Sequence, residues 1–335
     1  MTELEDVLSR LDPTTRKRVL QASEVTLDRL ALPSLGLNAA LHGGLGYGRQ
    51  TLVWGNKSAG KSSLLLETVA RAQRDEQKLC AWIDSEKSYD PEWAAKLGVN
   101  DKELIYSPIS TIEDLATVGT DLMLAGVDVL VVDSISSLLS SAYFEKDSTE
   151  LKDLSNTKQI GSEARDLANA VKMLNFANNH TALVLISQIR NKITTYGAMH
   201  QPTGGHAVVF FSTTSIKLWS SARPDDQIKG KVKSGDKLFD SFVGRPVTWT
   251  IEFNKIGPPG ETGRFDFYYQ GDQIGVDNIG EVLDVAERFG LVVKSGSWLS
   301  IYDETIQGRI KAVNYLRDNP AIRIKLEEEI HDKIR

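Results

Sequence analysis

Residues Gly55-Asn56-Lys57-Ser58-Ala59-Gly60-Lys61-Ser62 form a complete G-x-x-x-x-G-K-S motif, here called the phosphate loop. A short apolar run, Thr51 to Trp54, precedes it, and a helical pattern over Ser62 to Gln73 follows it. The glycines of such a loop let backbone N–H groups surround phosphate oxygens, and the helix N-terminus adds partial positive charge. Lys61 is placed to reach the β- and γ-phosphates, and the Ser62 hydroxyl to ligate Mg²⁺. The motif therefore predicts a nucleotide site between a strand and a helix.

Further along the chain, apolar runs and helical patterns alternate. The runs are Leu79 to Ile83, Val127 to Val132 and Thr181 to Ile186, and a helical pattern over Ser162 to Asn178 separates the last two. Near-continuous apolar runs are typical of strands that are buried on both faces of a parallel sheet. This β-α-β order predicts a doubly wound α/β domain.

Acidic residues follow two of these predicted strands. Asp133 ends the run Val129 to Val132, at the edge where such sheets bind ligands, so we expect it to hold the water shell of the Mg²⁺ ion. Asp84 and Glu86 both follow the strand that ends at Ile83. Either acid could orient or deprotonate the attacking water, and the residues alone do not distinguish between them.

The pattern changes after about residue 206. Val247, Trp249, Ile251 and Phe253 alternate with polar residues, which predicts an antiparallel strand with one exposed face. A turn at residues 257–260 leads to a hairpin partner at residues 265–269. Residues 276–335 return to short helices around a small hairpin near residues 291–302, which predicts a separate small domain. We expect Gly230 to Lys237 to be a flexible surface loop.

The N-terminal segment predicts a detachable amphipathic helix. Its apolar face consists of Leu4, Val7, Leu8 and Leu11, and the helix is expected to end at Asp12-Pro13. Such a helix packs either on its own core or on a neighbouring subunit.

Composition excludes several classes of protein. The chain has 335 residues, which suits two domains or one large α/β domain with appendages. Cys80 is the only cysteine, so a disulfide framework and a zinc-binding cysteine set are excluded, and a reducing cytoplasm is expected. No apolar run approaches the roughly 20 residues that span a bilayer, so no membrane contact is predicted.

The charge balance gives no overall sign of nucleic-acid binding. The chain carries 39 Lys and Arg against 45 Asp and Glu, a formal net charge of −6. Residues 261–335 hold 10 basic and 14 acidic side chains, so most of the excess acidity lies in the predicted C-terminal domain. A DNA-binding surface would therefore have to be local.

Beyond the phosphate loop, the chain resembles the RecA family of homologous-recombination ATPases. The resemblance runs from about residue 24 to about residue 320, and several motifs carry it in order. These are Gly55 to Ser62, Ala81 to Glu86, Asp90 to Val99, Val131 to Ser134, Ile186 to Ile193, Thr203 to Gly205 and Asn254 to Ile256.

The resemblance assigns roles around the nucleotide. It implies that ATP is bound with Mg²⁺, that Glu86 is the catalytic base, and that Asp90 and Trp93 hold the adenine. It also implies that Gln188 senses the γ-phosphate. The candidate catalytic residues are thus Glu86, Lys61, Gln188 and Lys255, and Ser62 and Asp133 are the metal ligands. The candidate nucleotide-binding residues are Gly55, Asn56, Lys57, Ser58, Ala59, Gly60, Lys61, Ser62, Ser63, Asp90 and Trp93.

The family pattern also places single-stranded DNA on two mobile loops. In this chain they correspond to about Tyr143 to Gly161 and about Arg190 to Gly205. Lys and Arg side chains there suit phosphates, and apolar or aromatic side chains suit bases. The candidate DNA-binding residues are Ile160, Arg165, Lys172, Arg190, Lys192, Ile193 and Tyr196.

One departure concerns charge at the ATP site. The family typically has two lysines around the asparagine of the later motif, donated into the neighbouring subunit's site. Here the first position is Phe253 and only Lys255 remains. Lys255 acts alone or another cation substitutes. This departure indicates a divergent member of the family, for which a phage origin is one interpretation.

We therefore expect an α/β fold: a RecA-like core with a mostly parallel sheet and an antiparallel edge hairpin. An N-terminal polymerisation arm would occupy residues 1–30, the ATPase core residues 31–270, and a small α+β domain residues 271–335. The expected function is a DNA-dependent ATPase that forms helical filaments on single-stranded DNA and exchanges strands with duplex DNA. The alternatives are a ring-forming motor of the same fold, either a hexameric helicase or a RadA-like branch-migration ATPase, and an ATP-gated DNA scaffold.

Overall fold

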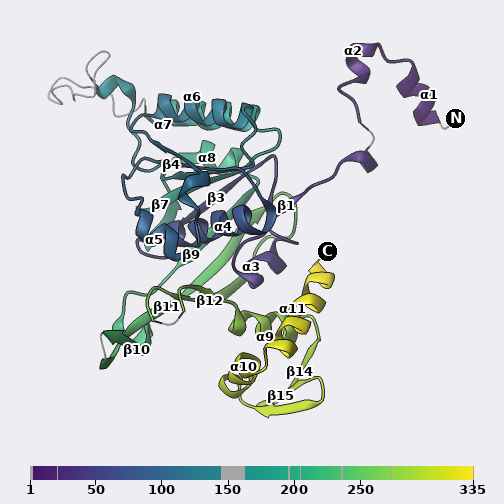
Figure 1. The fold of residues 1–335 in the computed structure, drawn as a ribbon. Coiled ribbons are helices and arrows are strands. Elements are labelled where there is room, and N and C mark those ends of the chain that lie inside the picture. Colours follow the sequence, from purple (N-terminus) through teal and green to yellow (C-terminus); the bar gives the residue numbers. More distant parts are fainter. Residues whose placement is uncertain are drawn as a thin grey trace.

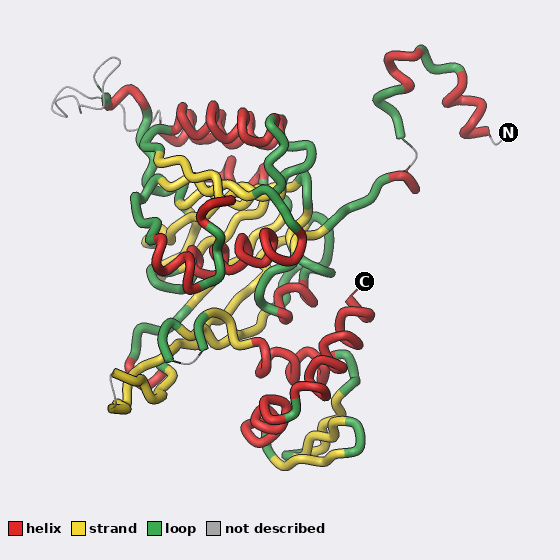
Figure 2. The backbone as a smooth tube through the Cα atoms, viewed as in Figure 1, coloured by secondary structure: helices red, strands yellow, loops and turns green. Residues whose placement is uncertain are grey.

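The computed structural model describes residues 3–20, 22–144, 163–194, 197–203, 205–234, 237–271 and 273–334. It consists of an α/β core, an N-terminal arm that stands away from the core, and a C-terminal domain below it (Figures 1 and 2). The core sheet is mixed and mostly parallel, as the sequence predicts.

The parallel part of the sheet holds the predicted buried strands. Its strands run β9-β3-β7-β6-β4-β5 in space, and every neighbouring pair in that order is parallel. The bounds are β9 (Thr214–Trp219), β3 (Arg49–Gly55), β7 (Ala182–Thr194), β6 (Val129–Asp133), β4 (Cys80–Asp84) and β5 (Leu104–Pro108).

Alternate side chains of these strands enter two different hydrophobic cores. In β3, Val53 packs on the face that α4 covers, whereas Leu52 and Trp54 pack under α6 and α7. Both faces are therefore covered by helices, which explains the near-continuous apolar runs. Figure 1 shows the two layers of helices on either side of the sheet. The helices are α4 (Lys61–Glu76), α5 (Pro91–Lys96), α6 (Ile112–Leu124), α7 (Glu163–Ala177) and α8 (Gly205–Phe211).

An antiparallel wing extends the sheet beyond β9. It consists of β11 (Lys237–Asn254), β12 (Thr262–Tyr268) and β13 (Gly275–Asp277). Val247 of β11 lies opposite Phe265 of β12, which confirms the expected hairpin.

The expectation of a flexible loop at residues 230–237 is wrong. Strand β10 (Ile228–Ser234) pairs with the first part of β11 from Ile228 opposite Gly244 to Ser234 opposite Lys237. Alternating lysines and a glycine suggested a solvated loop, but they lie in an antiparallel ladder that projects from the core (Figure 1).

The second expected DNA loop is also largely a hairpin. Strand β7 continues to Thr194, and β8 (Gly197–Pro202) pairs with it antiparallel, from Ile189 opposite Pro202 to Thr194 opposite Gly197. The pairing begins directly after Gln188, so this β7–β8 hairpin is a continuation of a core strand.

The C-terminal domain has its own small core. It contains α9 (Asn278–Arg288), β14 (Val292–Ser295), β15 (Trp298–Ile301), β16 (Glu304–Gln307), α10 (Arg309–Asp318) and α11 (Pro320–Ile334). Leu35 and Ala39 of α3 (Leu35–Ala40) join this core and attach the domain to the ATPase domain. This α+β composition matches the expectation.

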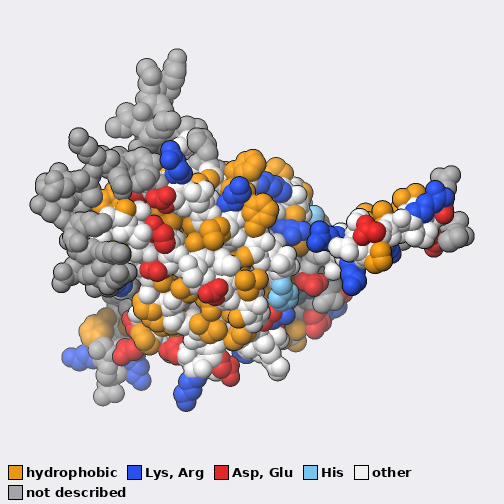
Figure 3. Space-filling model, turned by 90° about the horizontal axis from the view of Figure 1, so that it is seen from above, with side chains coloured by type: hydrophobic (Ala, Val, Ile, Leu, Met, Phe, Trp, Pro, Cys, Tyr) orange, Lys and Arg blue, Asp and Glu red, His pale blue; other side chains and the backbone are white. Residues whose placement is uncertain are grey.

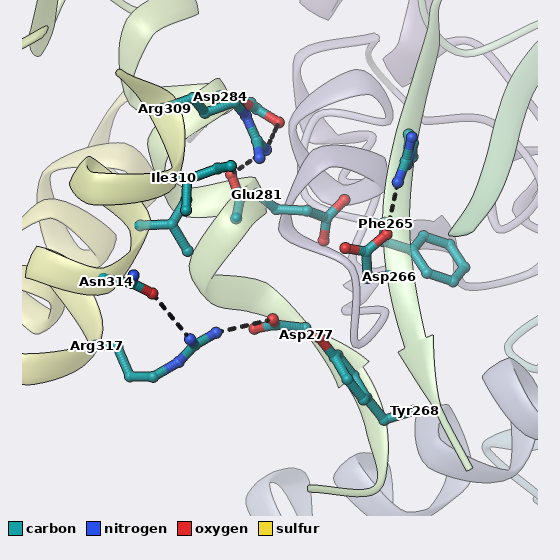
Figure 4. Close-up of a pocket in the computed structure, with 13 residues that line it drawn as sticks. Phe265, Asp266, Tyr268, Asp277, Glu281, Asp284, Arg309, Ile310, Asn314 and Arg317 are labelled. Atoms are coloured by element: carbon teal, nitrogen blue, oxygen red, sulfur yellow. Dashed lines mark hydrogen bonds and ion pairs between the residues drawn. The ribbon is translucent and has the colours of Figure 1, made fainter. Parts of the chain in front are cut away.

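Polar contacts close the seam between the C-terminal domain and the core sheet. The buried Glu281 of α9 accepts a hydrogen bond from the Ser34 hydroxyl at the start of α3, at 2.7 Å. Arg317 of α10 lies 3.5 Å from Asp277 of β13, and Asp284 pairs with Arg309 within the domain. Glu281 and the residues of these two pairs line a cleft of about 510 Å³ between β12 and the domain (Figure 4).

The N-terminal arm packs little on the rest of its own chain. It contains α1 (Glu3–Ser9), α2 (Pro13–Arg16) and the 3₁₀ turn η1 (Ala22–Glu24), and it joins the core at β1 (Arg29–Leu30), which pairs with β2 (Leu45–Gly46). The arm exposes Leu4, Val7, Leu20 and Val25, each by more than half of its surface. The described residues also include the 3₁₀ turns η2 (Asp101–Glu103), η3 (Ser141–Tyr143) and η5 (Pro224–Asp226). Among the described residues, no helix is long and apolar enough to cross a bilayer.

Candidate functional site

The predicted site residues meet at the carboxyl ends of the parallel strands. Gly55, the last residue of β3, lies opposite Gln188 of β7. In the neighbouring pair, Asp84 at the end of β4 lies opposite Asp133 at the end of β6. The sheet register therefore brings the phosphate loop, the acids and the glutamine to one edge.

The phosphate loop ends in a helix N-terminus that no side chain caps. Gly60 is the N-cap residue of α4, with φ of 83°, and no side chain accepts from the first N–H groups of this helix. By contrast, Ser34, Asp90 and Thr111 cap α3, α5 and α6 with side-chain oxygens. The N–H groups of α4 are thus available to an anion, which suits a phosphate.

Lys61 points back into the phosphate loop. Its ammonium group donates to the carbonyl oxygens of Gly55 at 3.2 Å and Asn56 at 2.9 Å. Burial lowers the pKa of Lys61, and the nearby charges of Asp133 and Glu86 oppose that shift. A phosphate group in the loop would give this buried ammonium an anion in direct contact, in addition to the two carbonyl oxygens.

Asn56 anchors the loop to the sheet. Its amide nitrogen donates to the Ser220 carbonyl at 2.7 Å, and its amide oxygen accepts from the Ser220 N–H at 3.1 Å. The Ser220 hydroxyl in turn donates to the Pro246 carbonyl. Asn56 therefore fixes the loop's position, whereas Lys57 and Ser58 are exposed.

Ser62 and Asp133 form the predicted metal-binding pair. The Ser62 hydroxyl hydrogen-bonds the Asp133 carboxylate, and burial raises the pKa of Asp133 to about 6. A desolvated carboxylate beside a hydroxyl is an oxygen donor set that a hard divalent cation stabilises. Among the described residues, no group of three or more His, Cys, Asp and Glu side chains could hold a metal. This arrangement fits Mg²⁺, which usually takes few protein ligands and completes its shell with waters and phosphates.

The geometry separates the two acids that follow β4. Asp84 is fully buried, and its carboxylate accepts from the backbone N–H groups of Glu86, Ser88 and Tyr89 and from the Tyr106 hydroxyl. Asp84 thus stabilises the turn, and neither of its carboxylate oxygens is accessible to a substrate. Glu86 is exposed at the tip of that turn.

Glu86 is hydrogen-bonded to residues of two neighbouring strands, directly after the end of β6 and within β7. Its Oε1 accepts from the Ser134 hydroxyl at 2.6 Å and from the Gln188 side-chain amide at 2.8 Å. A carboxylate with hydrogen-bond donors on two strands is held in one orientation, and its other oxygen can accept a proton from water.

Gln188 connects this acid to the β7–β8 hairpin. The main-chain carbonyl oxygen of Gln188 accepts from both the N–H and the hydroxyl of Thr203. The main-chain N–H of Gln188 donates to the Ser136 hydroxyl. Ser187 donates to the Thr203 carbonyl. The Gln188 side chain thus contacts Glu86, and the Gln188 main chain contacts Thr203 at the base of the hairpin.

The residues expected near adenine lie on α5. Asp90 is the N-cap residue of α5, where its carboxylate accepts from the Glu92 N–H at 2.9 Å. Trp93 is half-buried, and its indole N–H donates to the Ser63 hydroxyl at 3.2 Å. Trp93 thus lies beside the first turn of α4, next to the phosphate loop.

Lys255 and Phe253 lie at the far end of β11, away from the phosphate loop of the same chain. The Lys255 ammonium donates to the Phe210 carbonyl and lies 5.5 Å from the centroid of the Phe210 ring. Lys255 and the Phe210 side chain are both exposed. The structure therefore does not bring Lys255 together with Lys61 and Glu86 within one subunit.

Known protein families and relatives match almost the whole chain. The family described as RecA N-terminal domain matches residues 7–274, and the family described as RecA C-terminal domain matches residues 280–335. The chain belongs to the RecA family. Protein RecA of Pseudomonas putida is 35% identical over 319 residues, which cover 92% of this chain and 83% of that protein. Protein RecA of Colwellia psychrerythraea strain 34H is 35% identical over 312 residues, with 91% and 84% covered.

Membership of the RecA family establishes the general activity. The chain is a DNA-dependent ATPase of recombination and repair that forms filaments. Members of this family bind ATP, generally with Mg²⁺, bind DNA and self-assemble. The ring-forming alternative is not favoured.

Two of the expected DNA-binding residues lie on the surface of α7. Arg165 and Lys172 are both exposed, seven residues apart, and so they share one helix face. Figure 3 views the molecule from the side of α6 and α7, where Lys and Arg side chains lie among hydrophobic ones. The backbone of Arg190, Lys192 and Ile193 lies in β7. Ile160 and Tyr196, and most of the first DNA loop, lie outside the described residues.

Sequence reasoning missed several residues that touch this RecA-family site. Ser134 and Ser136 hydrogen-bond Glu86 and Gln188, and Arg245 of β11 donates to the Ser58 carbonyl at 2.9 Å. Ser134 follows Asp133 directly and Ser136 comes two residues later, so their position after the strand end was a usable signal. Arg245 is 187 residues from Ser58 in the sequence, and no motif marks it.

Proposed function

We propose that the phosphate loop and the acids beside it bind and hydrolyse ATP. The uncapped N-terminus of α4 and the Lys61 ammonium bind the phosphates. Glu86 orients the attacking water and accepts its proton. Ser62 and Asp133 would hold Mg²⁺, which when bound neutralises charge on the phosphates. Asp84 acts through the turn that presents Glu86.

We assign Gln188 the coupling between ATP and DNA. The observation that carries this proposal is the path of hydrogen bonds from Glu86 through Gln188 to Thr203, at the base of the β7–β8 hairpin. A γ-phosphate beside Glu86 competes for the Gln188 amide, and the hairpin then changes its position relative to the core. ATP thereby controls the surface that carries Arg190, Lys192 and Ile193.

We propose that single-stranded DNA lies along that hairpin and the exposed face of α7. Arg165 and Lys172 contact its phosphates, and the hairpin residues, with Ile160 and Tyr196, contact bases and backbone. With ATP bound, the filament pairs this strand with homologous duplex DNA and exchanges strands.

We infer that the filament forms through the arm. Residues 1–30 dock on a neighbouring subunit, residues 31–270 form the ATPase core, and residues 271–335 form the outer domain. The arm exposes the apolar side chains Leu4, Val7, Leu20 and Val25, which would be buried on docking. Lys255 reaches the neighbour's ATP site across the same interface. The single buried cysteine suits a reducing cytoplasm.

Measurement of ATP hydrolysis with and without single-stranded DNA tests the coupling. Wild type should be strongly stimulated by DNA. Gln188→Ala should bind MgADP as wild type does, because Gln188 lies outside the loop, but should lose most of the stimulation. A Gln188→Ala variant that DNA stimulates as strongly as wild type would show that the signal takes another route.

A further inference from the structure

One cation contacts the phosphate loop from outside the motif. The Arg245 guanidinium on β11 donates to the carbonyl oxygen of Ser58, at 2.9 Å. Among the residues that the structure describes, no carboxylate forms an ion pair with Arg245. The loop therefore has an arginine at its edge whose charge is not neutralised by an acidic partner.

Packing fixes this arginine in place. The guanidinium lies 5.4 Å from the centroid of the Tyr269 ring. Tyr269 is held by its N–H, which donates to the Val243 carbonyl, and by its hydroxyl, which donates to Gln227. An aromatic face and a carbonyl oxygen together restrain an arginine to one orientation before any ligand binds.

The strand that carries Arg245 is also tied to the loop on its other side. The carbonyl oxygen of Pro246, the next residue, accepts from the Ser220 hydroxyl, and Ser220 pairs with Asn56 of the loop through two hydrogen bonds. Arg245 is thus part of the rigid frame of the phosphate loop.

The remaining donors of Arg245 are available to a ligand. A guanidinium has five N–H donors, and the carbonyl of Ser58 accepts from one nitrogen. Ser58 is two residues before Gly60, where the uncapped helix begins. A polyphosphate in the loop would lie near this charge, and guanidinium groups bind phosphates bidentately.

We propose that Arg245 is a nucleotide-binding residue that supplies positive charge to the polyphosphate from the same subunit. This inference rests on the proposed function, because it requires phosphates in the loop. It differs from the role of Lys255, which needs a neighbouring subunit. Arg245 can therefore bind the nucleotide in a single chain that has not assembled.

Calorimetric titration of MgADP into the full chain tests the proposal. Arg245→Gln should weaken binding about tenfold at low ionic strength, as expected for the loss of one charge-assisted hydrogen bond. The deficit should shrink at high ionic strength, because salt screens an exposed charge. Arg245→Lys keeps the charge but loses the planar, bidentate geometry, so its affinity should fall by less than that of Arg245→Gln and the remaining charge should keep its salt dependence.

Arg264→Gln is the matched control, since Arg264 lies on the adjacent strand β12 and pairs with Asp266, and it should bind as wild type does. Wild-type affinity in Arg245→Gln would overturn the inference and leave the proposed function intact. Equal, salt-independent losses in Arg245→Gln and Arg245→Lys would also overturn it, because they would reveal only a mechanical restraint on the loop. If wild type itself does not bind MgADP, the proposed function fails as well.

Discussion

At the scale of single residues, the fold of the turn after β4 distinguishes Asp84 from Glu86. Asp84 is placed where three backbone N–H groups and a tyrosine hydroxyl occupy its carboxylate. Glu86 is presented to solvent by the same turn and is held by Ser134 and Gln188. The buried acid therefore stabilises the turn, and we propose that the exposed acid is the base.

Glu86→Gln tests this assignment. The amide cannot accept a proton from water, so the rate of ATP hydrolysis should fall by about 10²–10⁴-fold. Binding of MgADP should stay close to wild type, because Glu86 is not part of the phosphate loop. The rate is measured as phosphate release at saturating ATP, with binding measured by calorimetry. A variant that hydrolyses ATP at the wild-type rate would remove Glu86 from the mechanism.

Glu281 gives a second residue-scale prediction, about pH. Burial raises the pKa of Glu281 from its ordinary value of 4.5 to about 8, although hydrogen bonds from Ser34, Gly36 and Leu35 oppose the shift. The folded state thus keeps a proton that the unfolded chain loses above about pH 4.5. Stability should therefore fall as pH rises from about 4.5 to about 8.

Glu281→Gln cannot ionise, so it should lose this dependence. We compare the free energies of unfolding of variant and wild type at each pH. Their difference should favour the variant more at pH 9 than at pH 5, by at most roughly 5 kcal/mol. Urea unfolding at both pH values measures the difference. An identical stability difference between variant and wild type at both values would contradict the buried, protonated carboxyl.

At the scale of elements, close packing between β11 and β12 leaves no room for a side chain at Gly263. A Cβ at Gly263 would collide with the buried Trp249 ring on the paired strand β11. Gly263→Ala should therefore destabilise the protein by about 1–3 kcal/mol, since the ring has to move in a packed core.

Gly280 in α9 is the matched comparison. A Cβ there would meet Arg309 only at 3.4 Å, an ordinary contact, so Gly280→Ala should stabilise the helix by about 0.5–1 kcal/mol. Thermal unfolding of both variants measures the two effects. The packing account fails if Gly263→Ala melts at or above the temperature of Gly280→Ala.

The elements also show what the sequence could and could not predict. The parallel strands β3, β4, β6 and β7 followed from apolar runs, because their environment on both sheet faces is apolar, whereas β9 was not predicted. The β10–β11 hairpin was missed because Gly230 and its alternating lysines are typical of loops, although Val243 of β11 covers the Gly230 backbone. The phosphate loop followed from its motif, but Arg245 did not, because only the sheet register brings it to Ser58. Asp84 and Glu86 were inseparable in sequence, since both follow the same strand and only the fold of the turn distinguishes them.

At the scale of the whole molecule, we propose that the arm and Lys255 act between subunits. The arm stands away from the core and exposes Leu4, Val7, Leu20 and Val25 (Figure 1). Lys255 lies far from its own Lys61 and Glu86 and contacts the exposed Phe210 instead. Under this proposal, assembly brings Lys255 to the ATP site of the neighbouring subunit.

Removal of residues 1–25 should separate assembly from nucleotide binding. The shortened chain retains the whole phosphate loop and should bind MgADP with wild-type affinity, but it should remain a monomer by light scattering when ATP and DNA are present. Full-size assemblies of the shortened chain would show that the arm is not the connection between subunits.

The central claim is that ATP drives this chain to assemble as a helix on single-stranded DNA. Electron microscopy of the full chain with single-stranded DNA and a slowly hydrolysed ATP analogue tests it most directly. The account predicts extended helical filaments that cover the DNA and are lost when ADP replaces the analogue. Closed rings, or filaments that form equally well with ADP, would contradict it.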